Sequence, residues 1–295
     1  MIKNAIIYTF KADAGAIQAD ALDASLQAYA FKPCGATQEK SSGWVPPRGH
    51  NFGALAESVA GQVILKLAIE TKSVPKQAVD RALAERIAKI ENLEGRKPGR
   101  KETRELRDEI ITDLLPHAFP KNSGVLVWID PVREIIVIDA GSQGKADEVT
   151  TALCQCVPGI QIGLLNTVTS PQAAMTQWLT GEQDQWPTGF APGRFVELHS
   201  GDEMKSVVKF DRHHLDDEQM RLHIGQGKLP TKLALDWQGR VSFVLTHGTR
   251  LHKIEIDVVG DKPGDGDAFD ADVSISTSEL GAMIDDLVAA LGGKL

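Results

Sequence analysis

Two Glu-x-Lys triplets carry the residue types that a metal-dependent nuclease uses. They are Glu70-Thr71-Lys72 and Glu203-Met204-Lys205, in a chain of 295 residues. Such an enzyme holds a divalent cation with at least two carboxylates, beside a lysine that supports the attacking group. The stretch between Asp23 and Asp80 contains no aspartate that would partner Glu70. We therefore expect no enzymatic activity, and a metal-dependent nuclease is the alternative hypothesis.

Three other clusters invite a ligand-binding interpretation, and each lacks part of its motif. His213, His214 and His223 do not have the spacing of a zinc-binding helix. The acidic stretch 265–272 would need an oxygen ligand at Phe269 and a bidentate glutamate at Ser276 to form an EF-hand. The segment 225–229 contains Gly-Lys but neither the upstream glycine nor the following Ser/Thr of a phosphate loop. We predict no metal site and no cofactor.

The cysteines and the apolar segments narrow the class of protein. Cys34, Cys154 and Cys156 are too few for a disulfide framework, and their spacing lacks the second ligand pair of a zinc site. The longest apolar runs, 125–129 and 135–138, are strand-sized, far short of the roughly 20 residues that cross a bilayer. The first ten residues show no export signal. We expect a soluble, cytoplasmic protein with no membrane partner.

Positive charge is concentrated in one segment of an acidic chain. Residues 96–107 contain six cations, although the formal net charge of the chain is -8. Residues 75–107 contain ten Lys/Arg and six Asp/Glu, a local charge of +4. Residues 257–295 contain nine acids and two lysines, a local charge of -7. Charge separated in this way attracts an anionic partner to one region even when the whole chain is acidic.

The basic segment is predicted to lie on two helices. Helices at 76–93 and 98–115 have apolar stripes with helical spacing, formed by Val79, Leu83, Ile87 and Ile90 and by Leu106, Ile110 and Leu114. Gly95 and Pro98-Gly99 separate the helices, which predicts a protruding helical hairpin. On the second helix, an arc of about 120° contains Arg100, Lys101, Arg104 and Arg107.

This arc has two interpretations. A cation about every 5 Å along a helix is comparable with the phosphate spacing of one DNA strand, so the arc can follow a nucleic-acid backbone. The alternative is a solvated helix face whose cations pair with Glu102 and Glu105.

The whole chain predicts an α+β fold with mixed, mostly antiparallel sheets and flanking helices. Strands are expected at 2–10, 63–69, near 160, at 194–198, at 205–210 and near 273, with a hairpin over 125–139 and a meander over 233–258. Helices are expected after Asp13, at 146–156, after Pro171, at 216–225 and at 277–291. We expect a loop at 31–47 and a linker at 181–193. The predicted domains are 1–74 with 116–180, a helical tip at 75–115, and a second α+β region at 181–295.

Several short stretches of the chain carry a resemblance to known proteins. They are Phe31-Lys-Pro-Cys-Gly35, Gly43-Trp-Val-Pro-Pro47, Leu114-Leu-Pro-His-Ala-Phe119, Trp128-Ile-Asp130, Thr231-Lys-Leu-Ala-Leu-Asp-Trp-Gln238 and Ser278-Glu-Leu-Gly-Ala282. With these stretches the chain resembles the RdgC family of recombination-associated proteins, in order from residue 1 to about residue 293. The resemblance implies a homodimer closed into a ring by two interfaces, with a positively charged hole wide enough for duplex DNA. It also implies a nucleoid-associated protein that binds double-stranded DNA with little sequence preference and restrains the recombinase RecA. Single-stranded DNA is left open as a further ligand, and a scaffold that binds RecA or another protein directly is a further alternative.

The charge pattern and the resemblance together select the candidate DNA contacts. They are Arg96, Lys97, Arg100, Lys101, Arg104, Lys121, Lys209, Arg212, Lys228 and Lys232. The resemblance places Phe119 at a dimer contact, with an ordinary core aromatic as the alternative. The chain departs from the family at His117, where an arginine is familiar, and at Asp211, where a lysine is.

Overall fold

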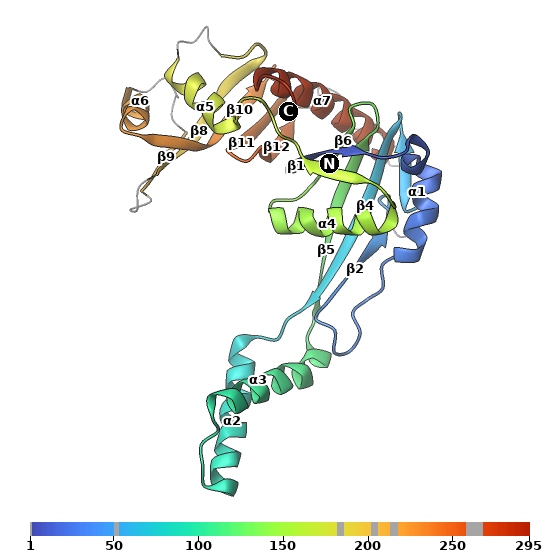
Figure 1. Cartoon of the computed structure of the whole chain (residues 1–295), viewed down its shortest axis with the longest axis vertical. Coiled ribbons are helices and arrows are strands. Elements are labelled where there is room, and N and C mark those ends of the chain that lie inside the picture. Colours follow the sequence, from blue (N-terminus) through green and yellow to red (C-terminus); the bar gives the residue numbers. More distant parts are fainter. Residues whose placement is uncertain (1, 50–52, 182–185, 202–205, 213–217, 258–267) are drawn as a thin grey trace.

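The computed structural model describes residues 2–49, 53–181, 186–201, 206–212, 218–257 and 268–295. The fold is α+β, as predicted, with a large antiparallel sheet and flanking helices (Figure 1). The strands are β1 (Ala5–Lys11), β2 (Lys40–Val45), β3 (Ala56–Val59), β4 (Gln62–Lys72), β5 (Pro120–Asp130), β6 (Ile135–Ile138), β7 (Gln161–Leu164), β8 (Phe190–Ser200), β9 (Val207–Asp211), β10 (Lys228–Trp237), β11 (Val241–Thr246) and β12 (Arg250–Ile256). The α-helices are α1 (Ala19–Leu26), α2 (Lys76–Glu94), α3 (Arg100–Leu114), α4 (Gln143–Cys156), α5 (Pro171–Thr180), α6 (Glu218–Gly225) and α7 (Ala268–Ala290). Short 3-10 helices are Ala14–Ile17, Gln27–Tyr29 and Leu115–His117.

Strand β1 joins the two halves of the chain into one sheet. The strand order is β2-β4-β5-β6-β1-β12-β11-β10-β8-β9, with β3 paired to β4 and β7 paired to β1. On one side of β1, Ile6 lies opposite Ile138 of β6. On the other side, Ala5 lies opposite Leu251 of β12. The sheet therefore continues from the first half of the chain into the second through its amino-terminal strand.

The sheet buries a hydrophobic core on each face. Successive residues of β1 point to opposite faces, so Ile6 and Tyr8 enter one core while Ala5 and Ile7 enter the other. Helices α1 and α4 cover the first core, and α5 and α7 contribute to the second. Burial on both faces explains why the apolar runs of β5 and β6 are continuous rather than alternating.

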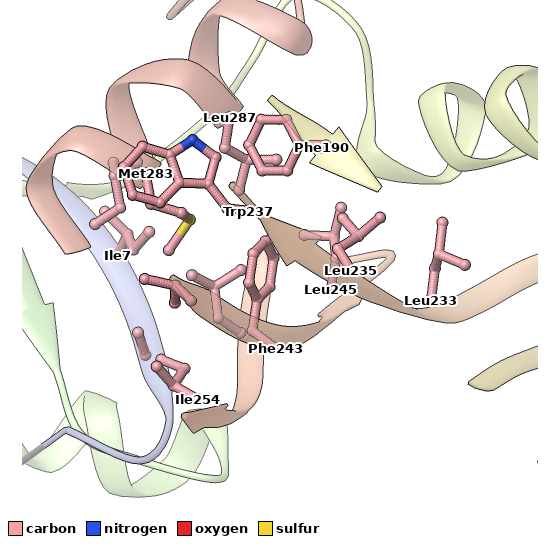
Figure 2. Close-up of a cluster of buried hydrophobic side chains, with 14 of the residues drawn as sticks. Ile7, Phe190, Leu233, Leu235, Trp237, Phe243, Leu245, Ile254, Met283 and Leu287 are labelled. Atoms are coloured by element: carbon pink, nitrogen blue, oxygen red, sulfur yellow. The ribbon is translucent and has the colours of Figure 1, made fainter. Parts of the chain in front are cut away.

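Helix α7 packs on strands β10 and β11. Figure 2 shows Trp237 and Phe243 of these strands directed towards Met283 and Leu287 of the helix, and all four side chains are buried. The indole Nε1 of Trp237 donates a hydrogen bond to Asp286 Oδ2 at 2.8 Å. The ring thus contributes apolar area while its polar nitrogen stays satisfied.

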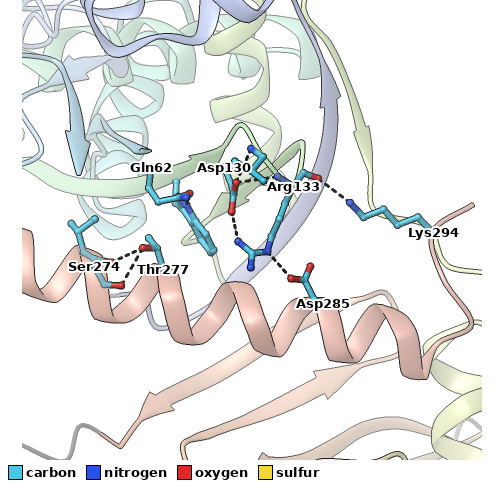
Figure 3. Close-up of polar contacts among 10 residues, drawn as sticks. Gln62, Asp130, Arg133, Ser274, Thr277, Asp285 and Lys294 are labelled. Atoms are coloured by element: carbon cyan, nitrogen blue, oxygen red, sulfur yellow. Dashed lines mark hydrogen bonds and ion pairs between the residues drawn. The ribbon is translucent and has the colours of Figure 1, made fainter. Parts of the chain in front are cut away.

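Polar contacts tie α7 to the β5–β6 turn (Figure 3). Arg133 in that turn donates from Nη1 to Asp130 Oδ2 and from Nε to Asp285 Oδ2 of α7, both at 2.8 Å. Lys294 Nζ donates to the carbonyl oxygen of Arg133 at 3.0 Å. Asp130 is fully buried, so the guanidinium compensates a charge that would otherwise be costly there.

The predicted strand near Val273 is wrong, because this residue lies inside α7. The stretch around it is rich in β-branched residues, which favour strands. In the structure Val273, Thr277, Leu280 and Ile284 are buried, and this spacing is that of one helix face. Burial of that face therefore decides the conformation against local propensity.

The predicted loop at 31–47 is also partly wrong, because residues 40–45 form β2. This strand lies at one edge of the sheet and stops before Pro46, where proline is tolerated. Strand β3 was not predicted, and β8 begins at Phe190, inside the predicted linker. The β5–β6 hairpin and the β10–β12 meander are confirmed.

Helices α2 and α3 begin and end within two residues of the predicted positions. None of the helices in the described ranges combines the length and the apolarity that crossing a lipid bilayer requires.

Candidate nucleic-acid interface

Helices α2 and α3 carry the basic segment. Helix α2 ends at Gly95, whose backbone is left-handed with φ of 67°. Glycine adopts this conformation without steric cost, which lets the chain turn after the helix. Helix α3 begins after Gly99, whose N–H donates to Glu102 Oε2 at 3.4 Å. The two helices pack through a small core of three buried residues, Val79, Leu83 and Ile110.

Two cations of the segment are held by carboxylates of the same helices. Arg96 lies between the helices and forms ion pairs with Glu94 and Glu102, each at 2.7 Å. Hydrogen bonding to Glu102, together with the charges of both carboxylates, raises the pKa of Arg96. Arg107 of α3 reaches Asp80 of α2 at 2.5 Å. Arg96 and Arg107 are therefore both paired with carboxylates in the folded chain.

Arg100, Lys101 and Arg104 lie exposed on α3, and we name these three residues the α3 ridge. Lys101 Nζ lies 3.8 Å from Glu105, and its side chain is 91% exposed. No carboxylate in the described parts of the chain forms an ion pair with Arg100 or Arg104. Exposed pairs such as Lys101–Glu105 contribute little energy, so the ridge leaves three cations available to a partner.

Two further candidate cations lie next to these helices in the chain: Lys97 is in the turn between α2 and α3, and Lys121 is in β5, which follows α3. Lys97 Nζ is 3.9 Å from Glu91, with an exposed side chain. Lys121 is exposed near the start of β5, opposite Thr71 of β4. Just before this strand, Phe119 is 93% exposed, so its interpretation as a core aromatic is wrong within one chain.

A second group of predicted cations surrounds Glu197 of β8. Its carboxylate is buried and forms ion pairs with Lys209 at 3.1 Å and Lys232 at 3.0 Å. His199 Nε2 lies 3.1 Å from the same carboxylate, and the hydroxyl of Thr231 donates to it at 3.2 Å. Burial acts to raise the pKa of Glu197, but hydrogen bonds from Lys232 and Lys209, together with the charge of Lys232, outweigh it and hold the pKa at about 2.

The remaining two candidates lie at strand ends near this group. Lys228 begins β10 opposite Ser200, and Arg212 follows β9 with a left-handed φ of 61°. The backbone N–H of Arg212 donates to the carbonyl of Arg194 at 2.7 Å.

The predicted contacts form two separate groups within one chain. Figure 1 shows α2 and α3 at one end of the molecule and β8 and β9 at the other, with the rest of the sheet between them. Lys209 and Lys232 are brought together, whereas the α3 ridge lies apart from them. One duplex segment would need a curved or composite surface to contact both groups.

The Glu70-x-Lys72 triplet serves a structural role. Glu70 is buried and its Oε1 accepts a hydrogen bond from the Cys34 N–H at 2.8 Å. Lys72 Nζ donates to the carbonyl of Gly35 at 3.0 Å. Both side chains therefore bind the segment before β2 to strand β4.

The other candidate sites for catalysis or metal binding are only partly visible. Residues 202–205, the histidine pair 213–214 and residues 265–267 lie outside the described residues. Within the described ranges, no group of three or more His, Cys, Asp or Glu side chains is arranged to hold a metal ion.

Sequence reasoning did not single out Glu197, His252 or Lys253, which gather beside Lys209 and Lys232 around one cavity. The signal that was available is the alternation along β8, where Val196 and Leu198 are apolar and Glu197 points the other way. That alternation predicts on which face of the sheet Glu197 lies, but it does not predict which strands lie beside β8.

The comparisons with known proteins agree with the resemblance. A family model described as "RdgC: Putative exonuclease, RdgC" matches residues 1–294. A Recombination-associated protein RdgC of Herminiimonas arsenicoxydans is 40% identical over 298 residues, which cover 99% of this chain and 98% of that protein. The protein of the same name from Cupriavidus necator is 40% identical over 299 residues, with the same coverage. The chain therefore belongs to the RdgC family.

Proposed function

We propose that the chain is a sequence-independent double-stranded DNA-binding protein that acts in homologous recombination. The observation that carries this proposal is the α3 ridge, an exposed group of cations in a chain of net charge -8. The names of the relatives, which associate them with recombination, support it. Phosphate contacts from exposed Arg and Lys side chains give affinity without reading bases, so binding would not depend on sequence.

In this proposal two chains form a ring around duplex DNA. Each chain contributes a protruding hairpin of α2 and α3, whose ridge lies against the phosphate backbone. The acidic remainder of the chain repels DNA from other surfaces and directs it to the ridge. A nucleoid-associated ring that occupies duplex would restrain RecA by limiting its access to that DNA.

The test is duplex binding across a salt series with a matched charge control. The triple variant Arg100→Ala, Lys101→Ala, Arg104→Ala should weaken binding to all duplex sequences alike. It should also flatten the log–log salt slope by about 0.9 for each lost phosphate contact. The control Lys11→Ala, Lys32→Ala, Lys145→Ala removes three exposed cations from other parts of the chain and gives the same net charge. Equal slopes for both variants would reject the ridge as the DNA-binding surface.

We further propose that the chain binds DNA without cutting it, and the family description makes an exonuclease the alternative to exclude. The structural role of Glu70 and Lys72 supports DNA binding without cleavage, because both side chains already form hydrogen bonds with backbone groups. Labelled duplex incubated with magnesium or manganese should stay intact. The nuclease would be favoured if magnesium or manganese causes the protein to shorten the duplex, if this activity persists after the protein is purified again, and if Glu70→Gln abolishes it.

The same ridge variant distinguishes restraint of RecA through occupied DNA from direct binding of the chain to RecA. If restraint of RecA works through occupied duplex, RecA activity on DNA should recover when the triple variant replaces the wild-type chain. Inhibition that persists after DNA binding is lost would favour direct contact between the two proteins.

A further inference from the structure

A cavity of about 520 Å³ is lined mainly by strands of the second half of the chain, with Asn4 and Gly141 from the first half. Figure 1 shows these strands far from α3. Its charged and aromatic walls come from β8, β9, β10 and β12, through Phe195, Glu197, Lys209, Lys232, His252 and Lys253. Three lysines and one carboxylate give these walls a charge of +2 when the histidine is neutral. Burial lowers the pKa of His252, and the charges of Arg250 and Lys232 add to the effect, so the neutral ring is favoured.

The strand register places two of these lysines directly beside Glu197. Lys209 of β9 is its neighbour on one side. On the other side, the β8–β10 register shifts between Pro230 and Lys232, which leaves Thr231 unpaired and brings Lys232 opposite Glu197. A bulge of this kind redirects side chains and is common beside functional sites.

Glu197 holds these lysines without using up their capacity to bind an anion. An ammonium group has three hydrogen-bond donors, and each lysine directs one of them at the carboxylate. The side chains of Lys209 and Lys232 are 58% and 42% exposed, whereas that of Glu197 is 6% exposed. The buried carboxylate therefore restricts the rotamers of both lysines and leaves their other donors facing the cavity.

Lys253 is brought to the cavity by an independent distortion. It has a left-handed backbone with φ of 52°, which is uncommon for a residue other than glycine. The β11–β12 register shifts at the same place, between Ser242 and Val244 on the facing strand. Lys253 Nζ lies 5.9 Å from the ring centre of Phe195. Strained backbone of this kind gathers at binding sites, where it fixes the direction of a side chain.

We propose that this cavity is a phosphate-binding pocket, in which Lys209, Lys232 and Lys253 bind the oxygens of one phosphate group. Lysine is a common phosphate ligand, and three of them converge here from three strands. The volume of the cavity exceeds that of a phosphate group and falls in the range of small-ligand sites. If the phosphate is part of a nucleotide, its sugar can therefore also enter the cavity and pack on Phe195. The pocket deepens the proposed function, on which its assignment to DNA rests, because Lys209 and Lys232 are also candidate DNA contacts. Binding of phosphate itself does not depend on whether the α3 ridge binds duplex.

Calorimetric titration of the full-length chain with inorganic phosphate, at constant ionic strength set by chloride, tests the pocket. We expect one site per chain. Lys232→Met and Lys253→Met should each lower the affinity about tenfold or more, the usual effect of losing a charge-assisted hydrogen bond. Lys253→Gly, which accepts a left-handed backbone, should lose phosphate in the same way and rules out misfolding as the cause. Lys145→Met, on the exposed side of α4, should leave the affinity unchanged within about twofold.

Competition identifies the source of the phosphate. Displacement of inorganic phosphate by duplexes with 5′-hydroxyl ends would assign the pocket to backbone phosphodiesters. Displacement only by 5′-phosphorylated duplexes would assign it to a terminal phosphate, and displacement by neither to a free phosphate compound. Absence of phosphate binding, or unchanged affinity in both Lys253 variants, would overturn the pocket while leaving duplex binding by the ridge intact. Phosphate binding without any duplex binding would instead overturn the proposed function alone.

Discussion

Glu197 keeps its charge although its side chain is buried. Taking a carboxylate out of water normally raises its pKa, because the charged form loses hydration. Here the hydrogen bonds of Lys232 and Lys209 and the charge of Lys232 reverse that effect, and the pKa lies at about 2 instead of the ordinary 4.5. The ionised carboxylate is thus more stable in the folded chain than in the unfolded one.

This difference predicts a pH-dependent loss of stability. A carboxylate with a depressed pKa contributes its full stabilisation above its unfolded pKa, and the contribution disappears as the pH falls through the folded pKa. Between pH 4.5 and about 2, wild-type protein should lose about 3 kcal/mol that Glu197→Gln does not lose. Urea unfolding of both proteins at several pH values measures the difference. The exposed Glu255→Gln is the control, and it should follow the wild type.

A constant difference between wild type and Glu197→Gln across this pH range would contradict the assigned ion pairs. It would mean that both lysines contact solvent rather than the carboxylate.

At the residue scale, the sequence selected candidate cations but did not predict their partners in the folded chain. Lys209 and Lys232 were selected, and the structure places both beside one carboxylate. Glu197 was not selected, because cross-strand neighbours depend on register, and here a bulge at Thr231 sets it. Arg96 was selected as a DNA contact, but the turn that brings Glu94 and Glu102 to it exists only in the folded chain.

At the scale of elements, prediction succeeded where one pattern dominates a segment. The β5–β6 hairpin follows from two apolar runs around an Asp-Pro turn, and α2 and α3 follow from their stripes and glycines. It failed where local preference and tertiary burial disagree. The first turns of α7 are rich in strand-forming residues, and only packing against the sheet makes them helical.

The close packing of α7 against the β5–β6 turn gives a prediction for this helix. Gly281 lies against Arg133, and a Cβ atom there would approach the guanidinium carbon to 2.8 Å. The guanidinium cannot easily move, because Asp130 and Asp285 hold it (Figure 3). Gly281→Ala should therefore destabilise the fold by about 1–3 kcal/mol through overpacking, despite the helix preference of alanine.

The matched control is Gly144→Ala in α4, where an added Cβ meets no atom within 4 Å. It should stabilise the fold by about 0.5 kcal/mol through helix propensity. Thermal unfolding of both variants measures the two signs. If both alanines stabilise, the contact between α7 and Arg133 is looser than the structure indicates.

At the scale of the whole molecule, the charge pattern of the sequence predicted an uneven distribution of charge. It did not predict how far apart the two cationic groups lie in the folded chain. The α3 ridge and the Glu197 group lie at opposite ends of one chain (Figure 1). A single chain presents each group separately, whereas a ring of two chains can present both to the same duplex. Assembly leaves little trace in one sequence, because the contacting surfaces are complementary only when a second copy is present.

Phe119 offers a way to test such a ring. A side chain that is 93% exposed contributes little to the stability of one chain, so Phe119→Ser should leave the unfolding temperature almost unchanged. A buried aromatic anchor at an interface is typically worth at least about 2 kcal/mol, so the same variant should raise the dimer dissociation constant about 30-fold. Sedimentation at several concentrations measures this change. Val132→Ser, 86% exposed in the β5–β6 turn, is the control and should not alter assembly.

The same pair of variants separates encirclement from simple binding. A closed ring on covalently closed circular duplex cannot leave without opening, whereas on linear duplex it can slide off an end when salt weakens the phosphate contacts. Wild-type protein should therefore survive a high-salt wash on the circle and be lost from the linear form. Phe119→Ser keeps the α3 ridge, so it should bind both forms at low salt and be washed from both. Equal retention of wild type and Phe119→Ser on the circular duplex would show that the protein binds DNA through its cations without forming a closed ring around it.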